Sequence, residues 1–165
     1  MSAMTFVWLS VLLVCVHADC QWQFGNSCYQ LLTGKMTFDE ALQACSAMGA
    51  GLVVPNSQNE NQFIWQMMKN HLPSDGRVWI GCTNKHTEGQ WMYAADTGKE
   101  CKFIDWAPNE PNGQDYGGED CAQMLDGKAG KWIDIGCSAV APVICEYYSS
   151  LEMTCLQADA DGRFA

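Results

Sequence analysis

Glu110-Pro111-Asn112 opens an acidic segment that continues through Glu119-Asp120-Cys121 and reaches Trp132-Ile133-Asp134. The segment places carboxylate and amide oxygens around one proline, in a stretch of chain that is mostly loop-like. Hard cations such as Ca²⁺ take about six to eight oxygen ligands, and an acidic loop held between cysteines meets that need. These residues therefore predict a calcium site whose open coordination positions face a ligand. Ile133, next to Asp134, does not fit this prediction, because its side chain offers no oxygen.

The loop itself lies between Trp106 and Cys121. It contains two prolines and three glycines and little apolar content over about 14 residues. Loops of this length inside a compact domain are usually functional. We therefore expect the ligand-binding residues to lie on this loop and on the segments beside it.

Two helices are predicted ahead of this loop. Thr37-Phe38-Asp39-Glu40 and Ser57-Gln58-Asn59-Glu60 are each a capping box followed by apolar residues at helical spacing, and Gly49 and Pro73 end the two helices. A hairpin with a Gly25-Asn26 turn is predicted within Cys20–Cys28. Short strands are predicted at 78–80, 90–93, 103–106, 122–125, 131–135 and 143–147. Two helices followed by short strands around a long loop predict an α+β domain.

The first 18 residues have the character of a secretory signal peptide. Thr5 to Val16 is almost wholly apolar, and Val16-His17-Ala18 is a small-residue cleavage signal. The alternative is an uncleaved membrane anchor, but the apolar run is shorter than the roughly 20 residues that span a bilayer. We expect a secreted, extracellular protein that starts near Asp19 and has no membrane partner. Residues 149–165 are expected to form a C-terminal tail.

Cysteine is abundant in this chain. Removing Cys15 with the leader from the ten cysteines leaves nine, a density that indicates disulfides in an exported protein. An odd number leaves at least one cysteine unpaired or bonded to another chain. Cys155 is the candidate because it follows the last strand-like segment. A free thiol and a disulfide-linked dimer both remain open for it.

Charge and motifs exclude several classes of function. The net charge of −10 repels phosphate backbones, so nucleic acid is not an expected partner. Only His71 and His86 remain after the leader, and no nucleophile or metalloprotease motif is present, so we expect no enzyme. Glu110 and Glu119 could be the carboxylate pair of a glycoside hydrolase, but calcium ligation explains the same residues better.

The sequence resembles the C-type lectin domain family from Cys20 to Glu146, within a predicted domain of residues 19–148. The resemblance is carried by an ordered set of motifs: Trp79-Ile80-Gly81, Thr87-Glu88-Gly89-Gln90-Trp91, Glu110-Pro111-Asn112, Glu119-Asp120-Cys121, Trp132-Ile133-Asp134 and Ile144-Cys145-Glu146. It implies an α+β fold of two helices with small antiparallel sheets, stapled by disulfides around a long calcium- and ligand-binding loop.

The resemblance also implies which cysteines pair. It pairs Cys20 with Cys28, as in the long form of the domain, Cys45 with Cys145, and Cys121 with Cys137. The family does not normally place cysteines at positions 82 and 101. A fourth bond between Cys82 and Cys101 is inferred from counting.

A principal calcium ion is implied at Glu110, Asn112, Glu119 and Asp134, with Pro111 in a cis peptide bond. In the family, neighbouring sugar hydroxyls complete the coordination of the ion, and the same four residues bind the sugar. The Glu-Pro-Asn order goes with mannose, fucose and N-acetylglucosamine, and the reversed order of acid and amide with galactose. The expected function is therefore calcium-dependent binding of mannose-type glycans. Microbial glycans are among the expected targets.

Two departures from the family pattern leave alternatives open. The family usually has Asn at position 133, which gives calcium an oxygen, so Ile133 indicates either a weakened site or a domain that lost the site. In the second case the domain binds a protein or another surface without sugar.

A second calcium site would use Asn84, Glu88, Glu119 and Asp120, although Asn84 stands where Asp is usual. The alternative for these residues is a solvated acidic surface.

Overall fold

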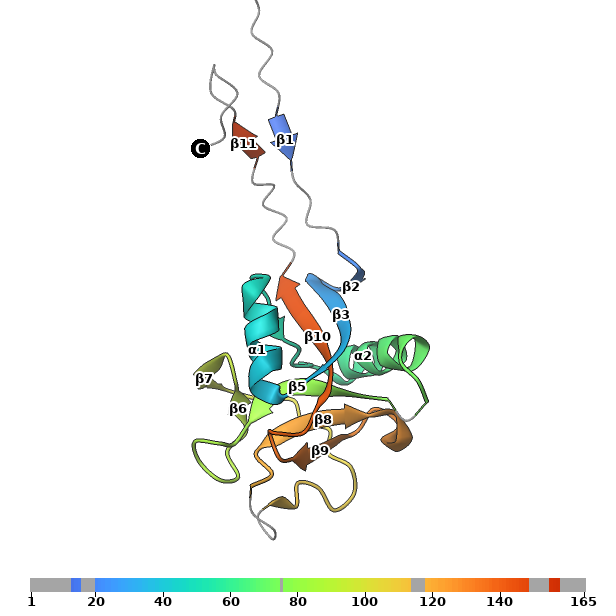
Figure 1. Cartoon of the computed structure of the whole chain (residues 1–165), viewed down its shortest axis with the longest axis vertical. Helices are drawn as coiled ribbons and strands as arrows, with labels where there is room; N and C mark the ends of the chain where they lie inside the picture. Colours follow the sequence, from blue (N-terminus) through green and yellow to red (C-terminus); the bar gives the residue numbers. More distant parts are fainter. Residues whose placement is uncertain (1–12, 16–19, 75, 114–117, 149–154, 158–165) are drawn as a thin grey trace, which may run out of the picture. The chain divides into compact units, whose positions relative to one another are not determined.

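The computed structural model describes residues 13–15, 20–74, 76–113, 118–148 and 155–157, which fall into two compact units (Figure 1). The larger unit, Cys20–Tyr148, contains β2 (Trp22–Phe24), β3 (Ser27–Met36), α1 (Phe38–Ala47), β4 (Gly51–Leu52), α2 (Gln58–His71), β5 (Arg77–Thr83), β6 (Met92–Tyr93), β7 (Asp96–Glu100), β8 (Cys121–Leu125), the 3₁₀ turn η1 (Asp126–Lys128), β9 (Trp132–Ile135) and β10 (Ala141–Tyr148).

Both predicted helices form, and their first turns differ in one respect. Thr37 accepts a hydrogen bond from the Glu40 amide, and the Glu40 carboxylate accepts one from the Thr37 amide, so the first capping box is complete. Ser57 also accepts from the Glu60 amide. The reciprocal bond predicted for the second box is wrong, because the buried Glu60 carboxylate accepts from the Tyr29 hydroxyl (2.6 Å) and the Asn56 amide (2.9 Å) instead.

The strands form two antiparallel sheets in the larger unit. One sheet has the order β2-β3-β10-β4, and the other has the order β7-β6-β5-β8-β9. In the first sheet, β10 pairs with β3 along most of its length, from Ala141 opposite Met36 to Tyr148 opposite Ser27. The predicted α+β architecture of two helices with small antiparallel sheets is confirmed.

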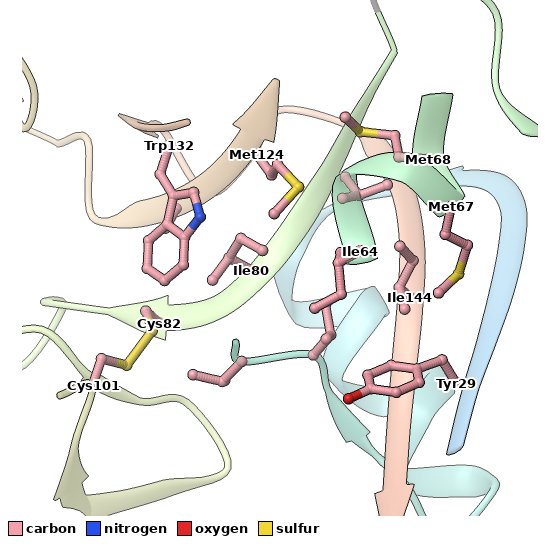
Figure 2. Close-up of a cluster of buried hydrophobic side chains, with 14 of the residues drawn as sticks. Tyr29, Ile64, Met67, Met68, Ile80, Cys82, Cys101, Met124, Trp132 and Ile144 are labelled. Atoms are coloured by element: carbon pink, nitrogen blue, oxygen red, sulfur yellow. A yellow bond between two sulfur atoms is a disulfide. The ribbon is translucent and has the colours of Figure 1, made fainter. Parts of the chain in front are cut away.

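Two buried clusters lie on opposite faces of β5 and β10. Val78 and Ile80 belong to the cluster packed against α2, whereas Trp79 between them belongs to the cluster packed against α1. This alternation is the period of two that a strand buried on both faces requires. Figure 2 shows the α2 cluster, in which Ile64, Met67 and Met68 meet Ile80, Met124 and Ile144.

One predicted strand is wrong, and two short strands of the larger unit were not predicted. Residues 103–106 do not form a strand; Trp106 makes only an isolated bridge to Trp132, and Phe103 packs edge-on against the same indole at 5.9 Å. Aromatic residues there fill the core rather than a sheet. The structure adds β4 and β7, which were not predicted, because β4 is two residues long and every residue of β7 is exposed and therefore lacks an alternating pattern.

Four disulfides hold the larger unit together. They join Cys20 to Cys28, Cys45 to Cys145, Cys82 to Cys101, and Cys121 to Cys137, which are the four pairs expected from the sequence. The bond between Cys45 and Cys145 spans 100 residues and ties α1 to β10. The Cys82–Cys101 bond lies within the α2 cluster, near the Trp132 ring (Figure 2).

The smaller unit comes from the predicted leader and tail. Here β1 (Leu13–Cys15) pairs antiparallel with β11 (Cys155–Gln157), with the Cα of Cys15 opposite that of Cys155. The rest of residues 1–18 and 149–165 lies outside the described residues, as do the side chains of Cys15 and Cys155. The predicted signal peptide, tail and unpaired cysteine therefore stay predictions. Among the helices of the described residues, none combines the length and apolar character needed to cross a membrane.

Gly130 is a position where any side chain should be costly. Its φ is +80°, and a Cβ there would lie 2.7 Å from Cγ of Trp65, so Gly130→Ala combines backbone strain with overpacking. We expect it to lower the free energy of unfolding by about 3 kcal/mol, measured by denaturant titration with the disulfides intact. Gly25→Ala is the control, because its φ is +57° with no atom within 4 Å, and it should cost about 1 kcal/mol from strain alone. Equal losses for the two variants would contradict the packing explanation.

Candidate functional site

Glu110 and Asn112 meet across a cis peptide bond. The Glu110–Pro111 bond is cis, and Asn112 Nδ2 donates a hydrogen bond to Glu110 Oε2 at 2.8 Å. The loop reaches this point through a tight turn in which Asn109 has a φ of 66° and the Glu110 amide donates to the Ala107 carbonyl at 3.1 Å. The two side chains that the sequence assigns to one ion therefore lie together.

Asp134 joins this loop to β9. Its carboxylate is buried and accepts hydrogen bonds from the backbone amides of Asn112 (2.9 Å) and Gly113 (2.7 Å). A Cβ at Gly113 would lie 2.8 Å from Asp134 Oδ2 and 2.8 Å from Cβ of Glu119, so no side chain fits there. Glycine at this position lets Asp134, Glu119 and the loop backbone come together.

Three carboxylates of like charge lie close to one another at this point. Burial, a hydrogen bond with Asp134 and the charges of Asp134 and Glu119 raise the pKa of Glu110 to about 7. Burial and the charge of Asp134 also raise the pKa of Glu119. The positive charge of Lys128 lowers the pKa of Glu110, but this effect is smaller than those that raise it. We call Glu110, Asn112, Glu119 and Asp134 the oxygen cluster.

The oxygen cluster fits a divalent cation by its chemistry. All four side chains offer hard oxygen ligands, and a bound cation would relieve the mutual repulsion of the three carboxylates. As they lie, the side chains bond to one another and to backbone amides. In the part of the chain that the structure describes, no three His, Cys, Asp or Glu side chains stand in a metal-binding arrangement. Because Asn112 Nδ2 donates to Glu110 Oε2, an ion held by both side chains would require the Asn112 side-chain amide to turn away from Glu110.

Ile133 lies between the two residues of β9 that organise the cluster. It is partly exposed and stands opposite Gln123 of β8, whereas Trp132 and Asp134 on either side of it are buried. Gln123 is fully buried, and neither of its amide atoms has a hydrogen-bond partner among the described residues. The strand thus supplies no side-chain oxygen at position 133.

The proposed second set of ligands also comes together in part. The Asn84 side chain donates from Nδ2 to Glu88 Oε1 at 2.9 Å, and the backbone amide of Asn84 donates to the backbone carbonyl of Asp120 at 3.2 Å. Asn84 is 4% exposed, and its Oδ1 has no hydrogen-bond partner among the described residues. A buried carbonyl oxygen without a donor is suited to a cation. Asp115, an acid in the same loop, lies outside the described residues.

A polar network at the start of β9 was not predicted from the sequence. Asp105 bonds to Lys131 Nζ (2.6 Å) and to Asn61 Nδ2 (3.1 Å), and Trp132 Nε1 donates to Asn61 Oδ1 (2.8 Å). One signal could have revealed Asn61, because it lies three residues before the buried Ile64 on the core face of α2. A polar residue on a core face is expected to have a specific partner.

Comparisons with known proteins agree with the fold and the motifs. The family model for the lectin C-type domain matches residues 34–147. C-type lectin domain family 4 member E of Mus musculus is 35% identical over 125 residues, which cover 74% of this chain and 56% of that protein. The matched regions cover 63%, 56% and 40% of three curated relatives, so the chain spans well under the full length of such proteins.

Solved structures give the same answer. The mouse scavenger receptor C-type lectin carbohydrate-recognition domain superposes with a TM-score of 0.68 at 28% identity, covering 77% of this chain and 94% of that domain. A calcium-independent type II antifreeze protein superposes with a TM-score of 0.68 at 27% identity, covering 83% of this chain and 96% of that protein. With most of Cys20–Tyr148 inside the matched region and the folds alike, the chain belongs to the C-type lectin domain family.

Proposed function

We propose that the chain is a calcium-dependent carbohydrate-binding protein of the mannose, fucose and N-acetylglucosamine type. The observation that carries the proposal is that Glu119 and Asp134 both lie against Gly113, with Glu110 close enough that burial and neighbouring carboxylates raise its pKa and that of Glu119. Membership of a family whose relatives include lectins supports carbohydrate as the ligand class. Microbial glycans are the proposed targets.

Each member of the oxygen cluster has a role in this proposal. Glu110, Asn112, Glu119 and Asp134 would hold Ca²⁺, and the ion would bind two neighbouring hydroxyls of one sugar ring. The carboxylates of Glu110 and Glu119 would accept hydrogen bonds from those hydroxyls, and the Asn112 amide would donate one. The acid-before-amide order of Glu110 and Asn112 supports mannose-type sugars over galactose.

The direct test is retention on mannan-agarose. The chain should be retained with calcium, released by a chelator, and pass through a galactose resin in both conditions. A single shallow site binds weakly, so a dense polymer is needed to give measurable retention. Retention that the chelator leaves unchanged, or no retention at all, would count against the proposal.

Exchanging the acid and the amide should exchange the sugar preference. Glu110→Gln combined with Asn112→Asp keeps the net charge and reverses the order of donor and acceptor around the hydroxyls. We expect retention to move from mannan to the galactose resin while remaining calcium-dependent. Unchanged retention on mannan would show that these two side chains do not contact the sugar.

Position 133 should set the strength of the site. Ile133→Asn adds an amide oxygen for the ion and a donor for the sugar, so calcium affinity by calorimetry is expected to rise about tenfold, or ~1.4 kcal/mol. Ile133→Val is the control, since it changes size without adding oxygen, and it should leave the affinity near that of the wild type. If neither the wild type nor Ile133→Asn binds calcium, the lectin proposal fails.

Asn84, Glu88, Glu119 and Asp120 are the proposed ligands of a second calcium ion. The buried Asn84 Oδ1 without a hydrogen-bond donor supports this assignment. Calorimetry on the wild type should then give two ions per chain. Asn84→Leu, which fills the space without an oxygen, should remove one of them.

The competing function is binding of a protein or another surface without sugar. Ile133 favours it, as does the similarity to an antifreeze protein that is calcium-independent. A glycan array without signal, together with a specific protein partner, would select this function.

We also propose that residues 1–18 direct export and that Cys155 links two chains. Non-reducing electrophoresis of the secreted protein with and without Cys155→Ser would test the dimer.

A further inference from the structure

The oxygen cluster is assembled from segments that lie apart in the sequence. The loop carries Glu110 and Asn112, and β9 carries Asp134. A functional set of ligands must be held within about 0.5 Å of its working geometry, so something must fix the loop relative to the strand. Asp134 makes the contact at the loop tip, which leaves the base of the loop to be accounted for.

Backbone hydrogen bonds fix the base of the loop to the start of β9. The Trp132 amide donates to the Asp105 carbonyl at 2.9 Å, and the Ala107 amide donates to the Trp132 carbonyl at 2.8 Å. The two bonds form the parallel bridge between Trp106 and Trp132. The chain is therefore already bonded to β9 at Asp105, just before it enters the loop.

The side chain of Asp105 extends this attachment to a second element. One carboxylate oxygen accepts from Lys131 Nζ at 2.6 Å, and the other accepts from Asn61 Nδ2 of α2 at 3.1 Å. The Asp105 side chain is only 13% exposed, whereas that of Lys131 is 43% exposed. A largely buried carboxylate with two such donors has one well-defined position.

Asn61 closes the network. It is 2% exposed, accepts from Trp132 Nε1 at 2.8 Å, and donates to the Gly130 carbonyl at 3.1 Å. Asp105, Lys131, Trp132 and Asn61 thus form a ring of contacts around the strand start. Because Trp132 lies two residues before Asp134, the ring sets the position of the strand that presents Asp134.

We propose that Asp105 is a positioning residue for the oxygen cluster. Among the described residues, the hydrogen bonds of Asp105 go to Lys131, Asn61, Gln58 and Trp132, and none of these is a cluster residue. It holds the loop base, β9 and α2 in one arrangement, so that Glu110 and Asn112 face Asp134. This inference rests on the proposed calcium site.

The decisive comparison is Asp105→Asn against Lys131→Met, with calcium affinity measured by calorimetry. Positioning predicts that each variant binds calcium about tenfold more weakly, as is typical when a supporting contact of a metal ligand is lost. A purely electrostatic effect predicts opposite signs, because Lys131→Met removes a positive charge three residues before Asp134 and should strengthen binding. The double variant should be no weaker than either single variant, since both break the same contact. Tighter binding by Lys131→Met would overturn the inference.

Lys128→Met is the matched control. Lys128 acts on the pKa of Glu110 through its charge. Its described hydrogen bond to the ring is made by the backbone, where the Lys128 carbonyl accepts from the Lys131 amide at 3.2 Å, so Lys128→Met keeps that bond. Loss of the Lys128 charge should leave calcium affinity unchanged or slightly higher. A tenfold weakening in this variant as well would show that the effect of Lys131→Met is not specific to the ring, and would overturn the inference.

Amide hydrogen exchange of the calcium-free protein tests positioning without any ion. Asp105→Asn should speed exchange at the amides of Ala107, Asn112 and Gly113, while the amides of β5 and β8 exchange as in the wild type. Unchanged exchange at the three loop amides, or faster exchange throughout, would overturn the inference. If the wild type binds no calcium, the proposed function falls, and this measurement alone still decides whether Asp105 positions the loop.

Discussion

Asp134→Asn is expected to weaken calcium binding by at least about 100-fold and to abolish retention on mannan. The Asp134 carboxylate accepts hydrogen bonds from the loop backbone, and its charge acts on both Glu110 and Glu119. An asparagine keeps the shape but has one acceptor oxygen where two amides need partners, so its own amide hydrogens would face the Asn112 or Gly113 N–H. Losing a charged hydrogen bond of this kind costs about 1.5–3 kcal/mol before the lost metal contact is counted. The calcium dissociation constant should therefore rise at least about 100-fold.

Calorimetry on the purified variant measures this change. Asp96→Asn is the charge-matched control, because Asp96 lies on the exposed strand β7 and removes the same negative charge. That control should bind calcium within about twofold of the wild type, since exposed charges at a distance are largely screened by salt. Wild-type calcium affinity in Asp134→Asn would show that calcium binding does not depend on the Asp134 carboxylate, which would contradict its place in the oxygen cluster.

The largest effect on stability is expected from the disulfide between α1 and β10. Replacing Cys45 and Cys145 together with alanine opens a loop of 100 residues, and chain entropy assigns that bond about 4.7 kcal/mol. Both cysteines are completely buried, so the variant also loses packing. A domain with a typical net stability of about 5–15 kcal/mol would then be close to unfolding at room temperature.

Replacing Cys82 and Cys101 is the matched comparison. These cysteines are also buried, but their bond closes a loop of only 19 residues. The chain-entropy relation therefore gives a smaller loss, by about 1.5 kcal/mol, and the two double variants should differ by that amount in denaturant unfolding. Equal losses would mean that packing around the sulfurs, rather than loop length, determines what each bond contributes.

Helix starts and buried strands were predictable because their signals are local. A complete capping box begins α1 at Thr37, and the apolar run at Val78–Ile80 became the centre of β5. Elements without a local pattern were missed. β7 has no buried residue, and Phe103 and Trp106 resemble a strand only because aromatic residues are common both in strands and in packed loops.

The oxygen cluster could be predicted by residue because its members follow a family motif, and its supporting shell could not. Asp105, Asn61 and Lys131 are separated by up to 70 residues, and each is an ordinary polar residue when considered alone. The role of Glu60 was misjudged for the same reason, since its partner Tyr29 lies 31 residues away on β3. Contacts between distant polar residues depend on the fold, which a single sequence does not display.

The pairing of β3 with β10 also bears on how such a domain can be joined to other chains. The larger unit begins at Cys20, which is bonded to Cys28, and Cys28 stands opposite Tyr147 at the end of β10, so the polypeptide enters and leaves this unit at neighbouring points (Figure 1). A unit with adjacent entry and exit points can be grafted into a surface loop of a host protein, or circularly permuted, with little distortion of either partner. Because the oxygen cluster draws on the other sheet, through β9, a graft made at these points would not interrupt the segments that carry it.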